Sequence, residues 1–293
     1  MLVNARGGRT SAGRVRRVAR AMLTDAGIPH EIVVTRSIRT LRRRASAAAR
    51  ERFTEVACAG GDGTISLVAR EVRDQGVPIA VIPCGTGNLL AKHLGVPLLL
   101  RPAIRALIES DRLVAIDAIE RDDGLSILNL SMGVSSLTMA DVDTPVKRVL
   151  GTLTYVVGVL VYLVRRNPAR FRITVDGEVH RVRAREVLVS NAGFRRTAVE
   201  TFFAHSDPGD GVLECAIFLP AGLRGAVAMV RDVLRHRAAR SNEYMITLPV
   251  RESVALESDP PLPIQADGDQ IASGRTVARV RRRAIRVRVP AGG

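Results

Sequence analysis

The chain has 293 residues, enough for one large domain or two, and its hydrophobic fraction of 46% supports buried cores. Its formal net charge of +15, carried almost wholly by arginine, suits nucleic acid, an anionic membrane or a phosphorylated substrate as partner. Aromatic residues make up only 3% and Trp is absent, which disfavours base stacking on single strands, and no helix-turn-helix or zinc-finger spacing occurs.

Up to about residue 115 the hydrophobic pattern alternates between strands and helices. This alternation predicts an α/β nucleotide domain over residues 1–115, with a doubly wound parallel sheet. The arginines of the segment 38–51 are interpreted as a solvated helix face, with membrane contact as the alternative. The predicted strands cover 2–3, 31–34, 54–59 and 77–82, and the predicted helices cover 14–26, 38–51, 65–75, 88–94 and 101–110.

Two glycine-rich turns follow buried strands of this domain. They are Gly60-Gly61-Asp62-Gly63-Thr64-Ile65-Ser66 and Gly85-Thr86-Gly87-Asn88. A strand that ends in glycines and begins a helix presents backbone N–H groups to a polyanion, and the helix dipole favours negative charge there. Parallel strands bring such turns to one edge of a sheet, so we predict a nucleotide-phosphate site. The alternative is a structural turn around a capping Asp62.

From about residue 116 the pattern changes to short strands separated by polar or glycine turns. We predict a β-rich, largely antiparallel, sandwich-like domain over 116–293, whose last strand, 284–289, is compatible with either domain. Only 146–166 and 222–239 have helical periodicity, and the first of these is apolar nearly all round, as in a buried helix, a lipid cleft or a membrane-surface helix. The other predicted strands are 113–120, 125–132, 171–176, 179–190, 212–219, 244–248, 253–257 and 263–266.

The cysteines and the apolar segments are typical of a protein in a reducing compartment, outside the secretory route. Cys58, Cys84 and Cys215 lie in or beside strand-like segments without a CxxC motif, which favours buried, reduced thiols. The N-terminus has no signal-peptide core, and the longest apolar segment, 149–164, is shorter than the ~20 residues of a membrane span. We therefore expect a cytoplasmic protein with peripheral contact to an anionic membrane.

The two glycine-rich turns resemble those of the diacylglycerol kinase/sphingosine kinase catalytic family, in particular the soluble bacterial lipid kinases. The second turn lies within Pro83-Cys84-Gly85-Thr86-Gly87-Asn88-Leu89-Leu90-Ala91. NAD kinases share the first turn but would carry an Asn-x-Gly-x-Leu-Gly-Phe type of segment after the next strand. The likeness covers most of the chain, since 4–8 stands at the family's Asn-Pro-x-Ser-Gly loop, Thr35 at its nucleotide-contacting Thr, and 127–129 at its Phe-(Leu/Ile)-Asn strand.

The resemblance implies an α/β nucleotide domain, distantly shared with NAD kinases and phosphofructokinases, a β-rich domain, and catalysis in the cleft between them. It also implies transfer of the γ-phosphate of ATP, with Mg²⁺, to a hydroxyl of a lipid such as diacylglycerol or a sphingoid or ceramide-type lipid. The residues that would bind the nucleotide are Asn4, Gly8, Thr35, Gly60, Gly61, Asp62, Gly63, Thr64, Ile65, Ser66, Gly85, Thr86 and Asn88.

Four aspartates are expected to bind the metal or to take part in proton transfer. Asp207 and Asp210, with the Val212 carbonyl, look by resemblance like a Mg²⁺ site, and oxygen ligands suit such a cation; a plain turn is the alternative. Asp269 stands in place of the Glu of the family's Asp-Gly-Glu and is the expected base, with Asp117 to polarise it or bind metal-bound water. Because Asp is one methylene shorter than Glu, the hydroxyl must approach closer or water must relay the proton.

Two other functions remain open. One is NAD kinase-like phosphorylation of a soluble nucleotide. The other is a catalytically impaired, basic membrane- or nucleic-acid-binding relative, favoured by the charge and by departures from the family at Ala5, Ser66-Leu67 and 194–196. No specific nucleic-acid partner is expected, and the sequence leaves the identity of the lipid and the oligomeric state open.

Overall fold

The computed structural model describes residues 1–5, 10–48, 50–51, 53–133, 167–191, 207–220, 225 and 244–291. The chain divides into two compact units, Met1–Ile116 with Arg283–Gly293 (unit 1) and Asp117–Arg282 (unit 2). The predicted helix 146–166 and nearly all of the predicted helix 222–239 lie outside the described residues.

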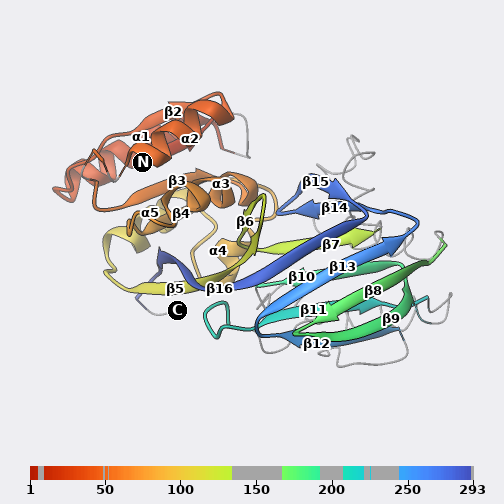
Figure 1. Cartoon of the computed structure of the whole chain (residues 1–293). Helices are drawn as coiled ribbons and strands as arrows, with labels where there is room; N and C mark the ends of the chain where they lie inside the picture. Colours follow the sequence, from red (N-terminus) through yellow and green to blue (C-terminus); the bar gives the residue numbers. More distant parts are fainter. Residues whose placement is uncertain are drawn as a thin grey trace. The chain divides into compact units, whose positions relative to one another are not determined.

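Unit 1 alternates strands and helices along the chain, as predicted. Its strands pair in parallel in the order β2-β1-β3-β4, and the end of β16 continues the sheet by pairing with β4 (Figure 1). The elements are β1 (Leu2–Asn4), α1 (Ala12–Asp25), β2 (Val33–Thr35), α2 (Ile38–Ala47), β3 (Val56–Gly60), α3 (Asp62–Val72), β4 (Ile79–Pro83), α4 (Leu89–His93), α5 (Leu100–Ile108) and the C-terminal part of β16 (Arg275–Arg288).

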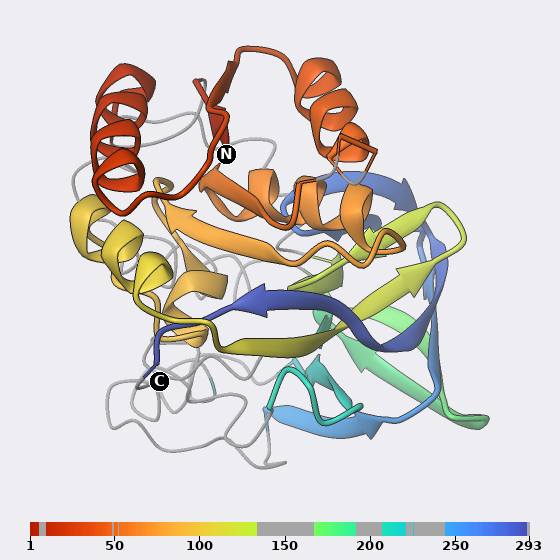
Figure 2. The ribbon, with the colours of Figure 1, turned by 90° about the vertical axis from the view of Figure 1, so that its left-hand side faces the viewer.

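Two pairs of helices cover the sheet of unit 1. Helices α1 and α5 lie side by side, and α2 packs on α3 (Figure 2). Val15 of α1 and Ile104 of α5 are buried with Val3 of β1 in one core cluster. Helix α2 begins after Ser37, whose hydroxyl accepts a hydrogen bond from the Thr40 N–H at 3.2 Å. The helices therefore cover the sheet in the way that a doubly wound fold requires.

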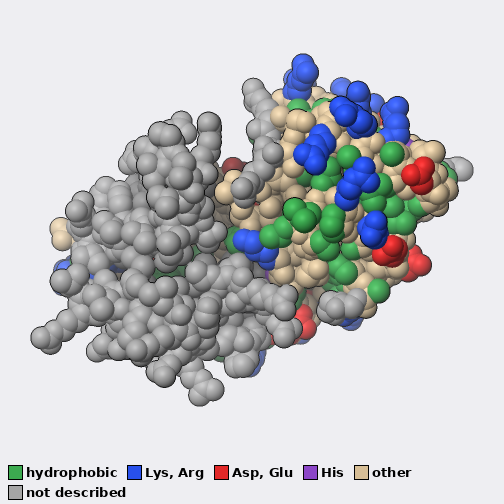
Figure 3. All heavy atoms as spheres, turned by 180° about the vertical axis from the view of Figure 1, so that it is seen from behind, with side chains coloured by type: hydrophobic (Ala, Val, Ile, Leu, Met, Phe, Trp, Pro, Cys, Tyr) green, Lys and Arg blue, Asp and Glu red, His purple; other side chains and the backbone are tan. Residues whose placement is uncertain are grey.

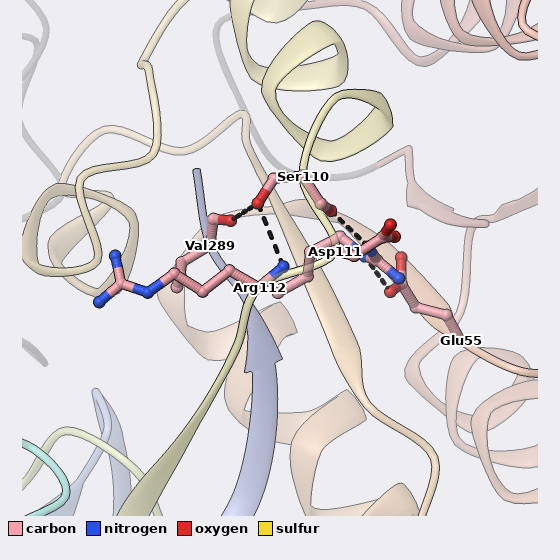
Figure 4. Close-up of polar contacts among 6 residues, drawn as sticks. Glu55, Ser110, Asp111, Arg112 and Val289 are labelled. Carbon is pink, nitrogen blue, oxygen red and sulfur yellow. Dashed lines mark hydrogen bonds and ion pairs between the residues drawn. The ribbon is translucent and has the colours of Figure 1, made fainter. Parts of the chain in front are cut away.

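Arg288 fixes the end of β16 within unit 1. Its guanidinium forms ion pairs with Glu55 and Asp111 and donates a hydrogen bond to the carbonyl of Ser110. The Ser110 hydroxyl donates to the Val289 carbonyl at 2.7 Å (Figure 4). Charge-assisted hydrogen bonds of this kind are stronger than neutral ones. The C-terminal strand is thus attached to segments that lie far from it in the sequence.

We expect Arg288→Met to lower the free energy of unfolding by about 2 kcal/mol, because it leaves two carboxylates and a carbonyl without their cationic donor. Urea denaturation followed by circular dichroism measures this. The control is Arg279→Met, because Arg279 pairs with Asp122 at an exposed site and should cost less than about 1 kcal/mol. Equal losses in the two variants would contradict the role assigned to Arg288.

Unit 2 is a two-layered β structure. One layer is a sheet with the order β12-β11-β10-β7-β14-β15, antiparallel throughout. The other layer has the order β16-β13-β8-β9, also with antiparallel neighbours (Figure 1). The strands are β5 (Leu113–Arg121), which runs from unit 1 into unit 2, β6 (Gly124–Ser126), β7 (Asn129–Gly133), β8 (Ala169–Val175), β9 (Glu178–Ala184), β10 (Glu186–Ser190), β11 (Leu213–Phe218), β12 (Met245–Val250), β13 (Ser253–Asp259), β14 (Pro263–Ala266), β15 (Asp269–Ser273) and β16.

The core of unit 2 lies between its two layers. Phe171, Ile173 and Val175 of β8 alternate with exposed or half-buried residues and are buried in one cluster with Leu130 and Met132 of β7. This alternation is the pattern of a sheet with one solvated face. The predicted β-rich, sandwich-like domain is therefore confirmed.

Two expected strands of unit 2 need correction, and two segments form strands that were not expected. The segment 179–190 is not one strand, because Ala184 pairs with Ala169 while Glu186 pairs with Gly133 in the other sheet. The chain changes sheet at Arg185, and a continuous apolar alternation does not reveal such a crossing. The segment 125–132 likewise forms β6 and β7, and neither β15 nor the first part of β16 was predicted.

The three cysteines are free and buried, as predicted. Burial raises the pKa of Cys58 and of Cys215 to about 12, so neither thiol ionises near neutral pH. Within the described ranges, no helix combines the length and hydropathy that crossing a membrane requires. Some large hydrophobic side chains are exposed, among them Leu98 and Leu99, and Figure 3 shows hydrophobic and basic side chains interspersed on one described surface.

Candidate active site

The two glycine-rich turns of unit 1 are in contact through their backbones. A Cβ built on Gly85 would lie 2.5 Å from the Cα of Gly61, and a Cβ built on Gly61 would lie 3.3 Å from the Cα of Gly85. The Cys84 N–H donates a hydrogen bond to the Gly60 carbonyl at 2.9 Å. The ends of β3 and β4 therefore form one continuous backbone surface, on which a side chain would force the turns apart.

Asp62 connects the first turn to the second. Its Oδ1 accepts a hydrogen bond from the Leu90 N–H at 3.3 Å, in the first turn of α4. Its Oδ2 would lie 2.9 Å from a Cβ built on Gly87. Asp62 thus caps a helix, as the structural alternative supposes, but this helix is α4 rather than its own helix α3. Gly61 is the N-cap residue of α3 and has no side chain, so no side-chain hydrogen bond from the N-cap residue caps the backbone N–H groups at the start of α3.

Asn4 links the end of β1 to the first turn. Its Nδ2 donates to the Thr64 hydroxyl at 2.8 Å, and the Thr64 side chain lies close over Gly60, where a Cβ would approach it to 2.6 Å. Thr35 pairs with Asn4 in the parallel register of β1 and β2. The Thr35 hydroxyl is buried and donates to the Val3 carbonyl at 3.4 Å. Unit 1 therefore brings Asn4, Thr35 and Thr64 to the same strand ends.

Asn88 stabilises the second turn. It has the left-handed φ of 49°, its Oδ1 accepts from the Gly85 N–H at 2.8 Å, and its Nδ2 donates to the Gly85 carbonyl at 2.8 Å. Asn tolerates this conformation better than most residues. Thr86, in the same turn, is exposed. The Asn88 amide is therefore committed to the turn, whereas the Thr86 side chain is accessible to a ligand.

Ile65 and Ser66 lie inside α3 rather than on the turn. Both side chains are buried, and the Ser66 hydroxyl has no hydrogen-bond partner among the described residues. A nucleotide could contact Ile65 only through its backbone. Gly8, the remaining predicted nucleotide residue, lies outside the described residues.

Asp117 is the centre of a buried network in unit 2. Its Oδ2 accepts from the Gly211 N–H at 2.6 Å, and its own N–H donates to the Pro208 carbonyl at 2.5 Å. The Asn191 side chain donates to the Asp117 carbonyl at 2.5 Å. Asp117 is fully buried, and its two hydrogen bonds to the segment 207–212 hold that segment in place. Asn191 was not among the predicted site residues.

Asp207 and Asp210 lie together in the segment that Asp117 holds. Both are exposed, and each Oδ1 accepts a backbone N–H two residues further on, at 3.0 Å from Gly209 and 2.9 Å from Val212. Burial, and then the charge of Asp210, raise the pKa of Glu214 to about 7. Each aspartate carboxylate thus stabilises its own turn through one oxygen, as the plain-turn alternative supposes, and the residues offer oxygen groups of the type that Mg²⁺ prefers. Over the described ranges, no cluster of three or more His, Cys, Asp or Glu side chains is arranged to bind a metal.

Asp267 anchors the turn that precedes Asp269. Its carboxylate accepts hydrogen bonds from the backbone N–H groups of Ile127, Leu128 and Asn129 at 2.9–3.0 Å. Asp267 is buried and has a φ of 50°. Asp269 is the exposed first residue of β15. This role of Asp267 was not predicted, although an Asp before Gly that tolerates a left-handed φ is typical of such a turn.

Two family models match these two parts of the chain. The diacylglycerol kinase catalytic domain matches residues 1–120, and the YegS C-terminal NAD kinase beta sandwich-like domain matches residues 129–289. The chain therefore belongs to the diacylglycerol kinase and YegS family of lipid kinases, as its glycine-rich turns predicted.

Individual relatives agree with this family. The chain is 29% identical over 201 residues to a diacylglycerol kinase of Bacillus subtilis, covering 65% of this chain and 63% of that protein. It is 27% identical over 248 residues to a protein of Stenotrophomonas maltophilia named "Probable lipid kinase YegS-like", covering 81% of this chain and 79% of the other. It spans only 51% of an uncharacterised Synechocystis protein and 57% of a Salmonella arizonae protein named "Probable lipid kinase YegS".

The fold also matches solved structures. A crystal structure of a diacylglycerol kinase from Bacillus anthracis has a TM-score of 0.80 at 18% sequence identity, covering 99% of this chain and 96% of that one. At this identity the match establishes the fold alone.

Proposed function

We propose that this protein is an ATP-dependent lipid kinase that transfers the γ-phosphate to a hydroxyl of a lipid such as diacylglycerol or a sphingoid or ceramide-type lipid. The observation that carries the proposal is the contact between Gly61 and Gly85. Glycines that leave little or no room for a Cβ, at 61 and 85, allow a phosphate to approach the backbone beside a helix start without a side-chain cap, where N–H groups favour an anion. Such a surface is of use to a triphosphate and of little use to the fold alone.

Unit 1 would bind the nucleotide. The turns at 60–66 and 85–88 would hold the phosphates through backbone N–H groups, and Thr86 would add an exposed hydroxyl. Asn4 would orient the Thr64 hydroxyl through their hydrogen bond of 2.8 Å. Asp62 would orient the second turn by capping α4. These groups supply positioning, which is the larger part of catalysis in phosphoryl transfer.

Unit 2 would supply the base and the metal ligands. Asp269 would accept the proton of the attacking lipid hydroxyl. Asp207, Asp210 and the Val212 carbonyl would hold Mg²⁺, which when bound supplies positive charge that offsets the charge of the phosphates. Asp117 would keep these ligands in place through its hydrogen bond to the Gly211 N–H. The ATP requirement favours a cytoplasmic protein, and the lipid acceptor favours peripheral contact with a membrane.

The test is transfer of label from [γ-³²P]ATP to separate acceptors. Diacylglycerol, ceramide, a sphingoid base and NAD are each offered with and without Mg²⁺, and the products are resolved by chromatography. We expect label in one of the lipids and none in NAD. Label in NAD alone would establish the NAD kinase-like alternative, and no label in any acceptor would support the catalytically impaired one.

A further inference from the structure

The solvent-facing side of β8 and β9 is covered by arginines. Phe171, Ile173 and Val175 point into the core of unit 2, so the alternate residues of β8 lie on the outer face. In the antiparallel register Arg170 lies opposite Arg183, and Arg172 lies opposite Arg181. All four arginines are exposed. We call these four residues the β8–β9 arginine face.

Like charges directly opposite each other on a sheet destabilise it. The only acidic residues in the two rows are on β13, where Asp259 pairs with Arg170 and Glu257 pairs with Arg172. No ion pair or hydrogen bond joins the four arginine side chains to any residue of the described ranges. The face therefore holds two positive charges in excess, and it lowers the stability of the sheet unless an external anion neutralises them.

The same residues surround a hollow of about 460 Å³. Its walls come from three neighbouring strands and include all four arginines together with Phe171, Val182, Glu257, Ser258 and Asp259. Arginine side chains combine apolar stems with charged ends that form bidentate hydrogen bonds to phosphate oxygens. The hollow and its arginines thus match the chemistry of a phosphate-bearing group at a surface.

We propose that the β8–β9 arginine face binds the phosphate headgroups of an anionic membrane. Charge complementarity supports this occupant, since anionic lipids attract basic surfaces with about 1 kcal/mol per arginine. Val179 lies 42% exposed opposite Thr174, one row beyond Arg172 and Arg181. An apolar residue beside the cations suits the interface between headgroups and acyl chains. The inference rests on the membrane contact that the proposed function expects and assigns a surface to it, and a binding test without nucleotide can fail while the kinase activity stands.

The test is co-sedimentation of the full-length protein with vesicles, without nucleotide. Vesicles of equal parts phosphatidylglycerol and phosphatidylcholine are compared with vesicles of phosphatidylcholine alone. We expect the wild type to bind the anionic vesicles and Arg170→Gln with Arg181→Gln to bind them about 25-fold more weakly, at about fivefold per arginine. The matched control, Arg39→Gln with Arg43→Gln on the exposed face of α2, removes the same charge and should bind like the wild type.

A second pair of variants protects the test against a folding defect. Arg170→Lys with Arg181→Lys keeps the charge and should retain vesicle binding, since headgroup attraction depends on charge. Equal weakening by the glutamine pair and the control pair would mean that net charge alone drives binding, and would overturn the proposal. Binding of the wild type to duplex DNA but not to vesicles would also overturn it.

Discussion

Asp269→Asn should lower kcat for transfer to a lipid hydroxyl by about 10²–10⁴-fold, the usual effect of removing a general base. Asparagine has nearly the size of aspartate and keeps a hydrogen-bonding group, but it cannot accept the proton at neutral pH. Asp269 is exposed at the start of β15, so the substitution disturbs no buried contact. ATP affinity should be unchanged, because the proposed nucleotide contacts belong to unit 1. Steady-state kinetics with saturating lipid, together with nucleotide binding by calorimetry, separates the two quantities.

Two further variants sharpen this prediction. Asp269→Glu restores the length of the family's residue and should keep or raise kcat, because the carboxylate then reaches further towards the hydroxyl. Asp122→Asn removes another exposed carboxylate of unit 2 and should leave kcat unchanged. Full activity of Asp269→Asn would exclude Asp269 as the base and would leave the proposed chemistry without its proton acceptor.

The parts of the structure that depend on local sequence were predictable. The strand and helix periods of unit 1 predicted its alternating order. Its glycine-rich turns were predictable because clustered glycines are typical of tight turns and of close backbone approach. The contact of Gly61 with Gly85 follows from the same logic, because parallel neighbouring strands bring their carboxyl ends together. The sequence-based predictions fail where a side chain or strand has a partner that lies far away in the sequence.

Distant partners explain what the sequence could not supply. Asp267 accepts hydrogen bonds from residues about 140 positions earlier, and Arg288 reaches Glu55 across 233 positions. No local pattern marks an aspartate or an arginine for such a role. The division of the predicted strand 179–190 between β9 and β10 has the same origin, because only the pairing partners of Ala184 and Glu186 reveal the change of sheet.

Gly85→Ala should abolish nucleotide binding while unit 1 stays folded. The new Cβ would lie 2.5 Å from the Cα of Gly61 and 3.0 Å from the Asn88 Oδ1, so the two turns must separate. The first contact is with backbone, which cannot rotate away as a flexible side chain could. We expect the free energy of unfolding to fall by about 1–3 kcal/mol, as for other overpacked sites. ATP affinity should fall much further, because the two turns proposed to hold the phosphates would no longer meet. Calorimetric titration with ATP and urea denaturation measure the two effects.

The matched control is Gly13→Ala in α1. No heavy atom lies within 4 Å of a Cβ built there, and alanine in a helix is favoured over glycine by about 1 kcal/mol. This variant should therefore be as stable as the wild type or more stable, with unchanged ATP affinity. If Gly85→Ala bound ATP as well as Gly13→Ala does, the contact between the glycine-rich turns would be a matter of packing alone, and the nucleotide would have to bind elsewhere.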